Sequence, residues 1–115
     1  MRRECNIEVR ENKNKDYVMI EVVGDLTATA EKDMDAAYKK ARSYNPKSIL
    51  LKFDGKSRIN SAGIAIVINL VIESKENDRP VYIIGVSKHF RKILELVGLA
   101  RFTTIVDSVE EVGKV

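Results

Sequence analysis

A serine where a strand pattern gives way to a helix pattern is the residue of this chain best placed to do chemistry. The tetrapeptide Asn60-Ser61-Ala62-Gly63 precedes the most apolar helix pattern in the sequence. A serine at a helix start can cap the helix, because its hydroxyl oxygen accepts a hydrogen bond from an N–H group of the first turn. The same place favours a phosphate, because free N–H groups and the helix dipole stabilise an anion there. We therefore interpret Ser61 as a cap, a phosphorylated switch, or both.

Two segments each match part of a known catalytic motif but lack one of its glycines. The segment Gly55-Lys56-Ser57 resembles the end of a phosphate-binding P-loop, but Leu50 stands where that motif needs a glycine. The segment Ser61-Ala62-Gly63 resembles the nucleophile elbow of hydrolases, but Ile59 replaces its first glycine. Neither segment by itself predicts nucleotide or ester hydrolysis.

His89 is the single histidine of the chain and Cys5 is the single cysteine. A serine triad requires the fold to bring His89 to Ser61 with an acid such as Asp107 behind it, so a hydrolytic role stays open as an alternative. One histidine and one cysteine make no metal site. We expect no catalytic residue, no metal and no cofactor, and we expect His89 on the solvated side of a helix.

Length and composition favour one cytoplasmic domain. A chain of 115 residues, taken as a single domain over 1–115, buries enough surface to need no disulfide or metal. The single cysteine excludes an intramolecular disulfide and fits a reducing compartment. Acidic and amide residues follow Met1-Arg2-Arg3 where a signal peptide requires an apolar stretch, so export is not expected. The longest apolar run, 62–72, is too short to span a bilayer, so we expect a soluble protein.

Charge patterning argues against a nucleic-acid partner. The formal net charge is +3 at pH 7. Basic and acidic residues are interleaved along the chain instead of forming one basic stripe. We expect no direct nucleic-acid binding and no membrane binding.

Hydrophobic periodicity predicts strands and helices in alternation. The predicted strands are an opening hairpin, formed by Ile7 and Val9 with 17–23, and then 49–53, 81–86 and 104–106. The predicted helices are 30–44, 61–75, 87–97 with Ser87 as its cap and Gly98 as its end, and a short final helix that begins at Asp107 or Ser108.

This order predicts an α/β fold with a single domain. We expect a mainly parallel mixed sheet with an antiparallel first strand and right-handed βα crossovers. In such sheets the functional end lies at the carboxyl ends of the strands. The polar residues expected at that edge are Asp25, Thr27, Asn60, Ser61 and Ser87.

The predicted helix 61–75 carries apolar residues on more than one face. By helical periodicity, the residues that point towards the sheet are Ile64, Val67, Ile68 and Val71. Ile66 points roughly opposite, with Leu70 between the two directions. These two residues either lie under a neighbouring helix or form a protein-binding patch beside Ser61.

Several of the segments described above resemble a known protein family. The segment 48–97 resembles a STAS domain, the fold of bacterial anti-sigma factor antagonists, and the resemblance covers nearly the whole chain. Its most specific part is Ile59-Asn60-Ser61-Ala62-Gly63-Ile64, which resembles the family's Asp-Ser-Ser-Gly-Leu motif. The turn Gly24-Asp25-Leu26 and the segment 85–98 support the resemblance.

The resemblance implies a regulated binding protein and not an enzyme. In such proteins the serine matching Ser61 is phosphorylated by an anti-sigma factor that is also an ATP-dependent serine kinase, and a phosphatase reverses the modification. The unphosphorylated antagonist binds that kinase and frees the sigma factor, so the implied role is transcription regulation by signal transduction through a phosphoprotein. The residues expected to bind the partner are Asp25, Thr27, Arg58, Ile59, Asn60, Ala62, Gly63, Ile66 and Ser87. We expect a monomer or a weak dimer.

Three positions depart from the family pattern. Thr27, Lys52 and Asn60 stand where the family usually has aspartate. The loss of these acids favours a second interpretation, in which the chain is a non-switching STAS scaffold or an interaction subunit of a signalling or lipid-transport complex.

Overall fold

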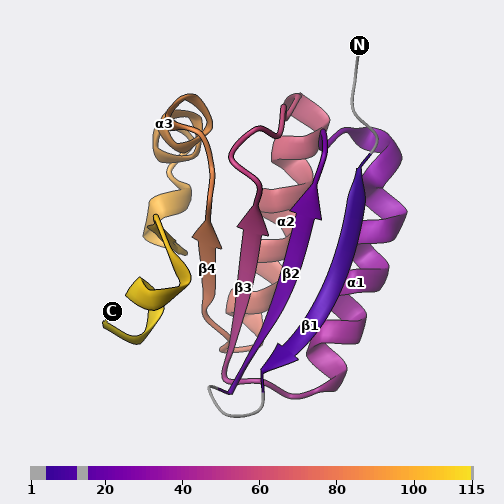
Figure 1. Cartoon of the computed structure of the whole chain (residues 1–115), viewed down its shortest axis with the longest axis vertical. Coiled ribbons are helices and arrows are strands. Elements are labelled where there is room, and N and C mark those ends of the chain that lie inside the picture. The colour runs from indigo at the N-terminus through magenta and orange to yellow at the C-terminus, as the bar shows by residue number, and fades with distance from the viewer. Residues whose placement is uncertain (1–4, 13–15, 115) are drawn as a thin grey trace.

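The computed structural model describes residues 5–12 and 16–114 as a sheet backed by helices (Figure 1). The strands are β1 (Asn6–Asn12), β2 (Tyr17–Val23), β3 (Ser48–Phe53), β4 (Val81–Ile84) and β5 (Thr104–Val106). The α-helices are α1 (Glu31–Ser43), α2 (Ser61–Glu76) and α3 (Lys88–Leu96). Short 3₁₀ helices are η1 (Ala28–Ala30), η2 (Leu99–Arg101) and η3 (Val109–Lys114). None of the helices in these ranges is long and apolar enough to cross a bilayer.

The strands lie side by side in chain order. The sheet runs β1-β2-β3-β4-β5, with β1 antiparallel to β2 and all the other neighbours parallel. Ile20 in β2 is paired with Val9 across the antiparallel ladder and with Leu51 across the parallel one. The predicted mixed sheet with an antiparallel first strand is confirmed. Of the polar turn expected over 12–16 between the first two strands, residues 13–15 lie outside the described residues.

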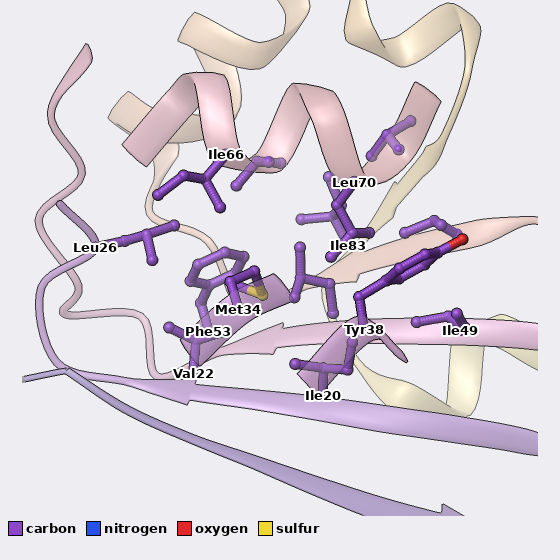
Figure 2. Packing of buried hydrophobic residues seen from close by; sticks show 14 of the residues in the cluster. Ile20, Val22, Leu26, Met34, Tyr38, Ile49, Phe53, Ile66, Leu70 and Ile83 are labelled. Atoms are coloured by element: carbon purple, nitrogen blue, oxygen red, sulfur yellow. The ribbon is translucent and has the colours of Figure 1, made fainter. Parts of the chain in front are cut away.

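One face of the sheet is covered by the α-helices, and the opposite face is covered only in part. The main core lies between the sheet and the α-helices, and Figure 2 shows Met34 and Tyr38 meeting Ile20 and Phe53 there. On the opposite face, Leu50, Ile84 and Val106 form a smaller cluster against which Val109 and Val112 of η3 pack. Residues 49–51 of β3 are buried on both faces of the sheet, which is why they form a continuous apolar run.

Two elements differ from their predicted bounds. The strand predicted over 81–86 ends at Ile84, because Gly85 adopts a left-handed backbone with φ of +77°. A Cβ on Gly85 would overlap with the carbonyl oxygen of Phe53, so only glycine lets the chain turn this close to β3. The short final helix is a 3₁₀ helix and begins at Val109, slightly after the predicted start.

The residues of α2 that face the sheet are largely those predicted. Val67 and Val71 are almost fully buried in the main core. Ile64 and Ile68 are only half-buried, although they pack against the same cluster. Their side of the helix therefore stays partly open to solvent.

The other side of α2 lies under neighbouring elements. Ile66 is 9% exposed and Leu70 is 4% exposed, and both belong to the main core. Figure 2 shows Ile66 beside Leu26. The interpretation that Ile66 and Leu70 lie under a neighbouring helix is confirmed. The interpretation of Ile66 as part of an exposed patch is wrong, because α1 and η1 pack against this side of α2.

Candidate functional site

Two loops that follow neighbouring parallel strands are joined by backbone hydrogen bonds. Residues 24–27 follow β2, and residues 54–60 follow β3. The Leu26 N–H donates to the Arg58 carbonyl at 2.9 Å, and the Asn60 N–H donates to the Leu26 carbonyl at 3.4 Å. Leu26 and Ile59 thereby form an isolated parallel bridge. The start of α2 is therefore anchored to the end of β2 as well as to its own strand.

Each of the two loops has a carboxylate that accepts a hydrogen bond from a backbone N–H of the other loop. Asp25, which follows β2, accepts a hydrogen bond from the Arg58 N–H at 3.0 Å and is 4% exposed. Asp54, which follows β3, accepts one from the Gly24 N–H at 3.4 Å. Hydrogen bonds to a charged acceptor are stronger than neutral ones. These acids hold the loops in place, so neither forms a simple acidic surface around Ser61.

The segment that resembles a P-loop is a turn closed by Asp54. The carboxylate accepts hydrogen bonds from the Lys56 N–H at 2.8 Å and from the Ser57 hydroxyl at 3.0 Å. An aspartate that binds a backbone N–H two residues further on is a common turn device. The geometry of this segment is thus accounted for without a bound phosphate.

The residue that caps α2 is Asn60. Its backbone is extended, and its Oδ1 accepts a hydrogen bond from the Gly63 N–H at 2.9 Å. Ser61 is the first residue of the helix and is exposed. Within residues 5–12 and 16–114, no hydrogen bond engages its hydroxyl. Of the two roles predicted for Ser61, capping therefore belongs to Asn60, and the hydroxyl points to solvent without a structural task.

Gly63 allows α2 to begin directly against the loop after β2. A Cβ at this buried position would overlap with the Leu26 carbonyl oxygen and would lie 2.8 Å from Cγ2 of Ile59. Any larger residue would push the helix start away from the loop. Gly63, one of the residues expected to bind a partner, is therefore part of the interior.

Thr27 is also turned inward. It is 6% exposed, and its hydroxyl lies 3.0 Å from the hydroxyl of Thr29. Its carbonyl accepts a hydrogen bond from the Ala30 N–H at 3.0 Å, which starts η1. Thr27 thus shapes the edge from within and is not on its surface.

Ser87 brings a third loop to the same edge. Its hydroxyl accepts a hydrogen bond from the Phe90 N–H at 3.1 Å, which confirms its predicted role as the cap of α3. A small hollow between the loops is lined by residues on both sides, including Ile59 and Ser87. The structure therefore places Ser87 and Ile59 beside each other, as expected for a common edge.

The loop that leads to the serine, 54–60, has no exposed acid. Arg58, Asn60 and Ser61 are exposed, and Ile59 and Ala62 are half-buried. An exposed hydroxyl at the start of a 16-residue helix can accept a phosphoryl group without disturbing the core. The positive end of the helix and the N–H groups of the first turn that Asn60 leaves unused would stabilise that phosphate.

Lys52 lies on the face of the sheet opposite α2. Alternate residues of a strand face opposite sides. Leu51 and Phe53 belong to the main core under the helices, whereas Leu50 belongs to the smaller cluster on the other face. Lys52 shares the face of Leu50, so its charge does not lie on the helix side where Ser61 begins α2.

The hydrolytic alternative finds no support in the geometry. Asp107 pairs with Arg91 at 3.2 Å, and His89 is exposed on α3, the solvated position expected for it. In the part of the chain that the structure describes, no contact joins Ser61, His89 and Asp107. The same residues contain no group of three or more His, Cys, Asp or Glu side chains that could hold a metal ion.

The structural roles of Asn60 and Asp54 were not predicted from the sequence. A signal for each was present, because Asn ranks with Ser as an N-cap and an Asp directly after a strand favours a turn. The bond from Arg58 to Asp25 had no local signal, because it joins residues 33 positions apart.

Comparisons with known proteins agree on family and fold. A model of the STAS domain matches residues 6–112. The anti-sigma-B factor antagonist of Staphylococcus aureus (strain NCTC 8325 / PS 47) is 20% identical over 94 residues, which cover 82% of this chain and 87% of that protein. An anti-sigma factor antagonist from Mycobacterium paratuberculosis superposes with a TM-score of 0.79 at 12% identity, over 96% of this chain and 92% of that one. The phosphorylated form of the Bacillus cell fate determinant SpoIIAA superposes with a TM-score of 0.67 at 17% identity, over 95% and 98%.

Proposed function

The chain belongs to the STAS domain family, and on that premise we propose that it is an anti-sigma factor antagonist that phosphorylation of Ser61 switches off. Its partner would be an anti-sigma factor that is also an ATP-dependent serine kinase. The observation that carries the proposal is the exposed hydroxyl at the first residue of α2, which Asn60 releases from capping. Curated and structural relatives that bear the name anti-sigma factor antagonist support the same role.

In this proposal the chain is a substrate and not an enzyme. The Ser61 Oγ attacks the γ-phosphorus of ATP held by the kinase, an O–P bond forms, and the bond to the ADP leaving group breaks. The hydroxyl proton passes to a base on the kinase, so this chain needs no general base of its own. A phosphatase then hydrolyses the phosphoserine and restores the hydroxyl.

The switch follows from charge and desolvation. In the unphosphorylated state, a partner can dock over the hydroxyl and the half-buried side chains of Ile59 and Ala62. A phosphoserine carries about −1.5 to −2 charges at pH 7. Burying that charge under an apolar or acidic partner surface is unfavourable unless it is paired. Binding should therefore weaken sharply once Ser61 is modified.

A second candidate function is a non-switching STAS interaction module. The observation that favours it is Asn60, which stands in place of the family's aspartate and is exposed beside Ser61. A kinase that reads a carboxylate at this position would meet a neutral amide. This candidate predicts stable partner binding that ATP does not alter.

Intact-mass spectrometry tests the leading proposal. The chain is incubated with ATP and the candidate anti-sigma kinase from its own genome, and Ser61→Ala is treated in parallel. Ser43→Ala serves as a matched control, because Ser43 is also an exposed helix serine but lies at the end of α1. We expect one phosphate on the unaltered chain and on Ser43→Ala, and none on Ser61→Ala.

A binding measurement completes the test. Ser61→Asp should bind the kinase more weakly than the unaltered chain. A variant that bound equally tightly would exclude the switch. Stable binding without phosphate transfer would instead support the non-switching module.

A further inference from the structure

Arg58 places a positive charge three residues before Ser61. Their Cα atoms lie at most about 11 Å apart, because each residue of a fully extended chain adds about 3.6 Å. Between them, Ile59 forms the isolated bridge to Leu26, and Asn60 has an extended backbone. Alternate residues of an extended segment point to the same side. Arg58 and Asn60 are accordingly exposed and Ile59 is half-buried, so Arg58 and Ser61 meet solvent at the same edge of the fold.

The fold holds the backbone of Arg58 and leaves its side chain free. The Arg58 N–H donates to Asp25 at 3.0 Å, and the Arg58 carbonyl accepts from the Leu26 N–H at 2.9 Å. Among the residues that the structure describes, none makes a hydrogen bond or an ion pair with the guanidinium. The Cα of Arg58 is thus fixed near Ser61, and its side-chain donors are available to a ligand.

The acids of the two loops do not compete for this guanidinium. In residues 24–30 and 54–60, the charged side chains are Asp25, Asp54, Lys56 and Arg58. Asp25 is buried and Asp54 is half-buried, and both accept hydrogen bonds from backbone N–H groups of the loops. The exposed charges that these two segments place beside Ser61 are therefore the two bases.

Of the two bases, Arg58 is better suited to a phosphate than Lys56. A guanidinium is planar and can donate two parallel hydrogen bonds to phosphate oxygens, whereas an ammonium acts as a point charge. Lys56 is five residues from Ser61 and lies in the turn that Asp54 closes. Arg58 is therefore the side chain that can add to the N–H groups of the first turn of α2 in binding an anion on Ser61.

The neutral side chain of Asn60 also favours such a contact. The family usually has aspartate at this position, and a carboxylate between Arg58 and Ser61 would repel a phosphate and attract the guanidinium. An amide does neither, and it still caps the helix. The replacement of this acid therefore leaves the positive charge of Arg58 to the phosphate.

We propose that Arg58 clamps the phosphate of phosphorylated Ser61 and thereby prolongs the switched-off state. This inference rests on the proposed phosphorylation of Ser61. Hydrogen bonds from the guanidinium to the phosphate oxygens hold the group against the edge of the domain, and a phosphatase reaches it only when the clamp opens. Arg58 stays protonated throughout, and no covalent bond forms or breaks at its side chain. It is a positioning residue, and the hydrolysis belongs to the phosphatase.

A phosphorus NMR titration of the full chain tests the clamp. Phosphoserine is incorporated at position 61 during synthesis, so the measurement does not depend on a kinase. A phosphoserine loses its last proton near a pH of about 6. Because the clamp favours the dianion, the midpoint for the unaltered phosphorylated chain should lie about 0.5 pH unit below that of Arg58→Gln. Salt at about 1 M should remove the difference, since it screens exposed charges.

Two further variants separate the clamp from a general effect of charge. Arg58→Lys keeps the charge but not the planar fork, so it should retain part of the shift. Arg101→Gln removes an exposed guanidinium next to Phe102, whose ring lies 4.0 Å from the Lys75 Nζ near the other end of α2. It should leave the midpoint unchanged. Arg58→Gln keeps both backbone hydrogen bonds of residue 58, so circular dichroism should show the same fold.

Hydrolysis by alkaline phosphatase measures how long the phosphate persists. A shift of about 0.5 pH unit corresponds to roughly a threefold change in an equilibrium constant. If the phosphatase acts on the unclamped phosphate, Arg58→Gln should lose its phosphate roughly threefold faster than the unaltered chain. Arg101→Gln should lose it at the unaltered rate.

Equal midpoints for the unaltered phosphorylated chain and Arg58→Gln would overturn the clamp. A midpoint that moved in Lys56→Gln and not in Arg58→Gln would also overturn it and would assign the contact to Lys56. Equal rates of hydrolysis would overturn its role in prolonging the switched-off state. None of these results bears on whether a kinase modifies Ser61, which the intact-mass experiment decides separately.

Discussion

Asn60 caps α2, and the adjacent Ser61 carries a free hydroxyl, although a serine could also have served as the cap. The side chain of Asn60 satisfies the Gly63 N–H, and the hydroxyl of Ser61 is left in solvent. A serine that capped its own helix would give up that bond on modification. In the proposed switch, the hydroxyl that would be phosphorylated is therefore separate from the side chain that caps the helix.

This division predicts different outcomes for substitutions at neighbouring positions. Asn60→Ala should lower the free energy of unfolding by about 1 kcal/mol, because the cap is lost. Asn60→Asp should keep the cap and the stability, since a carboxylate also suits the helix start. Urea denaturation of each variant measures the change. If Asn60→Ala is as stable as the unaltered chain, Asn60 is not the cap in solution.

Cys5 offers a prediction on pH. Burial, followed by the negative charges of Asp33, Asp25 and Asp54, raises the pKa of the Cys5 thiol. At a pH near the ordinary thiol pKa, the folded chain should therefore contain less thiolate than the unfolded chain. The stability that this thiol contributes is present below the unfolded pKa and is lost as the pH rises through the higher folded pKa.

Alkylation by iodoacetamide across a pH series measures this shift. The reaction of the folded chain should set in at higher pH than that of the urea-unfolded chain, because the thiolate is the reactive form. Asp33→Asn should move the folded profile part of the way back. Coinciding profiles for folded and unfolded chains would contradict the prediction.

At the scale of elements, the position of α2 depends on how closely it meets the loop after β2. The Leu26–Ile59 bridge and the bond from Arg58 to Asp25 hold the two loops together. Gly63 then brings the first turn of the helix against the Leu26 carbonyl. The serine is thus placed by contacts between elements and not by its own strand and helix alone.

Gly63→Ala tests this close approach, because the change in the free energy of unfolding should have opposite signs with and without the overlap. Helix propensity alone predicts a gain of about 1 kcal/mol for this change. The overlap with Leu26 and Ile59 predicts a loss of about 3 kcal/mol, since overpacking a filled site is destabilising. Thermal or urea unfolding decides between them.

A control in the same helix isolates the propensity term. Ala65 is exposed two residues further along α2. Ala65→Gly should lower stability by about 1 kcal/mol, as expected where only propensity matters. A stabilised Gly63→Ala chain would show that the helix start is less closely packed than the structure indicates.

At the scale of the whole molecule, the proposed switch should act without a change of fold. Ser61 is exposed and takes no part in the core. A phosphate at the start of α2 should raise the free energy of unfolding by roughly 0.3–1 kcal/mol through the helix dipole. Urea denaturation and circular dichroism on the two purified forms measure the effect. A lower urea midpoint for the phosphorylated form would mean that the switch works by loosening the domain.

Local sequence patterns were enough to predict the order of the strands and α-helices. The apolar run over β2 and the helical spacing that ends before Asn45-Pro46 are local patterns, and local patterns follow from backbone and side-chain chemistry. Ser61 was identified in the same way, from its place between an apolar strand and an apolar helix. These local patterns do not depend on contacts with distant parts of the chain.

Which side chains of the site face solvent depends on packing in the folded chain. Asp25 and Thr27 turn inward, Ile66 lies under α1 and η1, and Asn60 takes the cap. Apart from the cap, the burial of these side chains depends on packing between segments far apart in the chain. Local periodicity does not predict such packing. The candidate phosphate acceptor could therefore be predicted from the local sequence, whereas the exposed surface around it depends on the contacts that bring the two loops together.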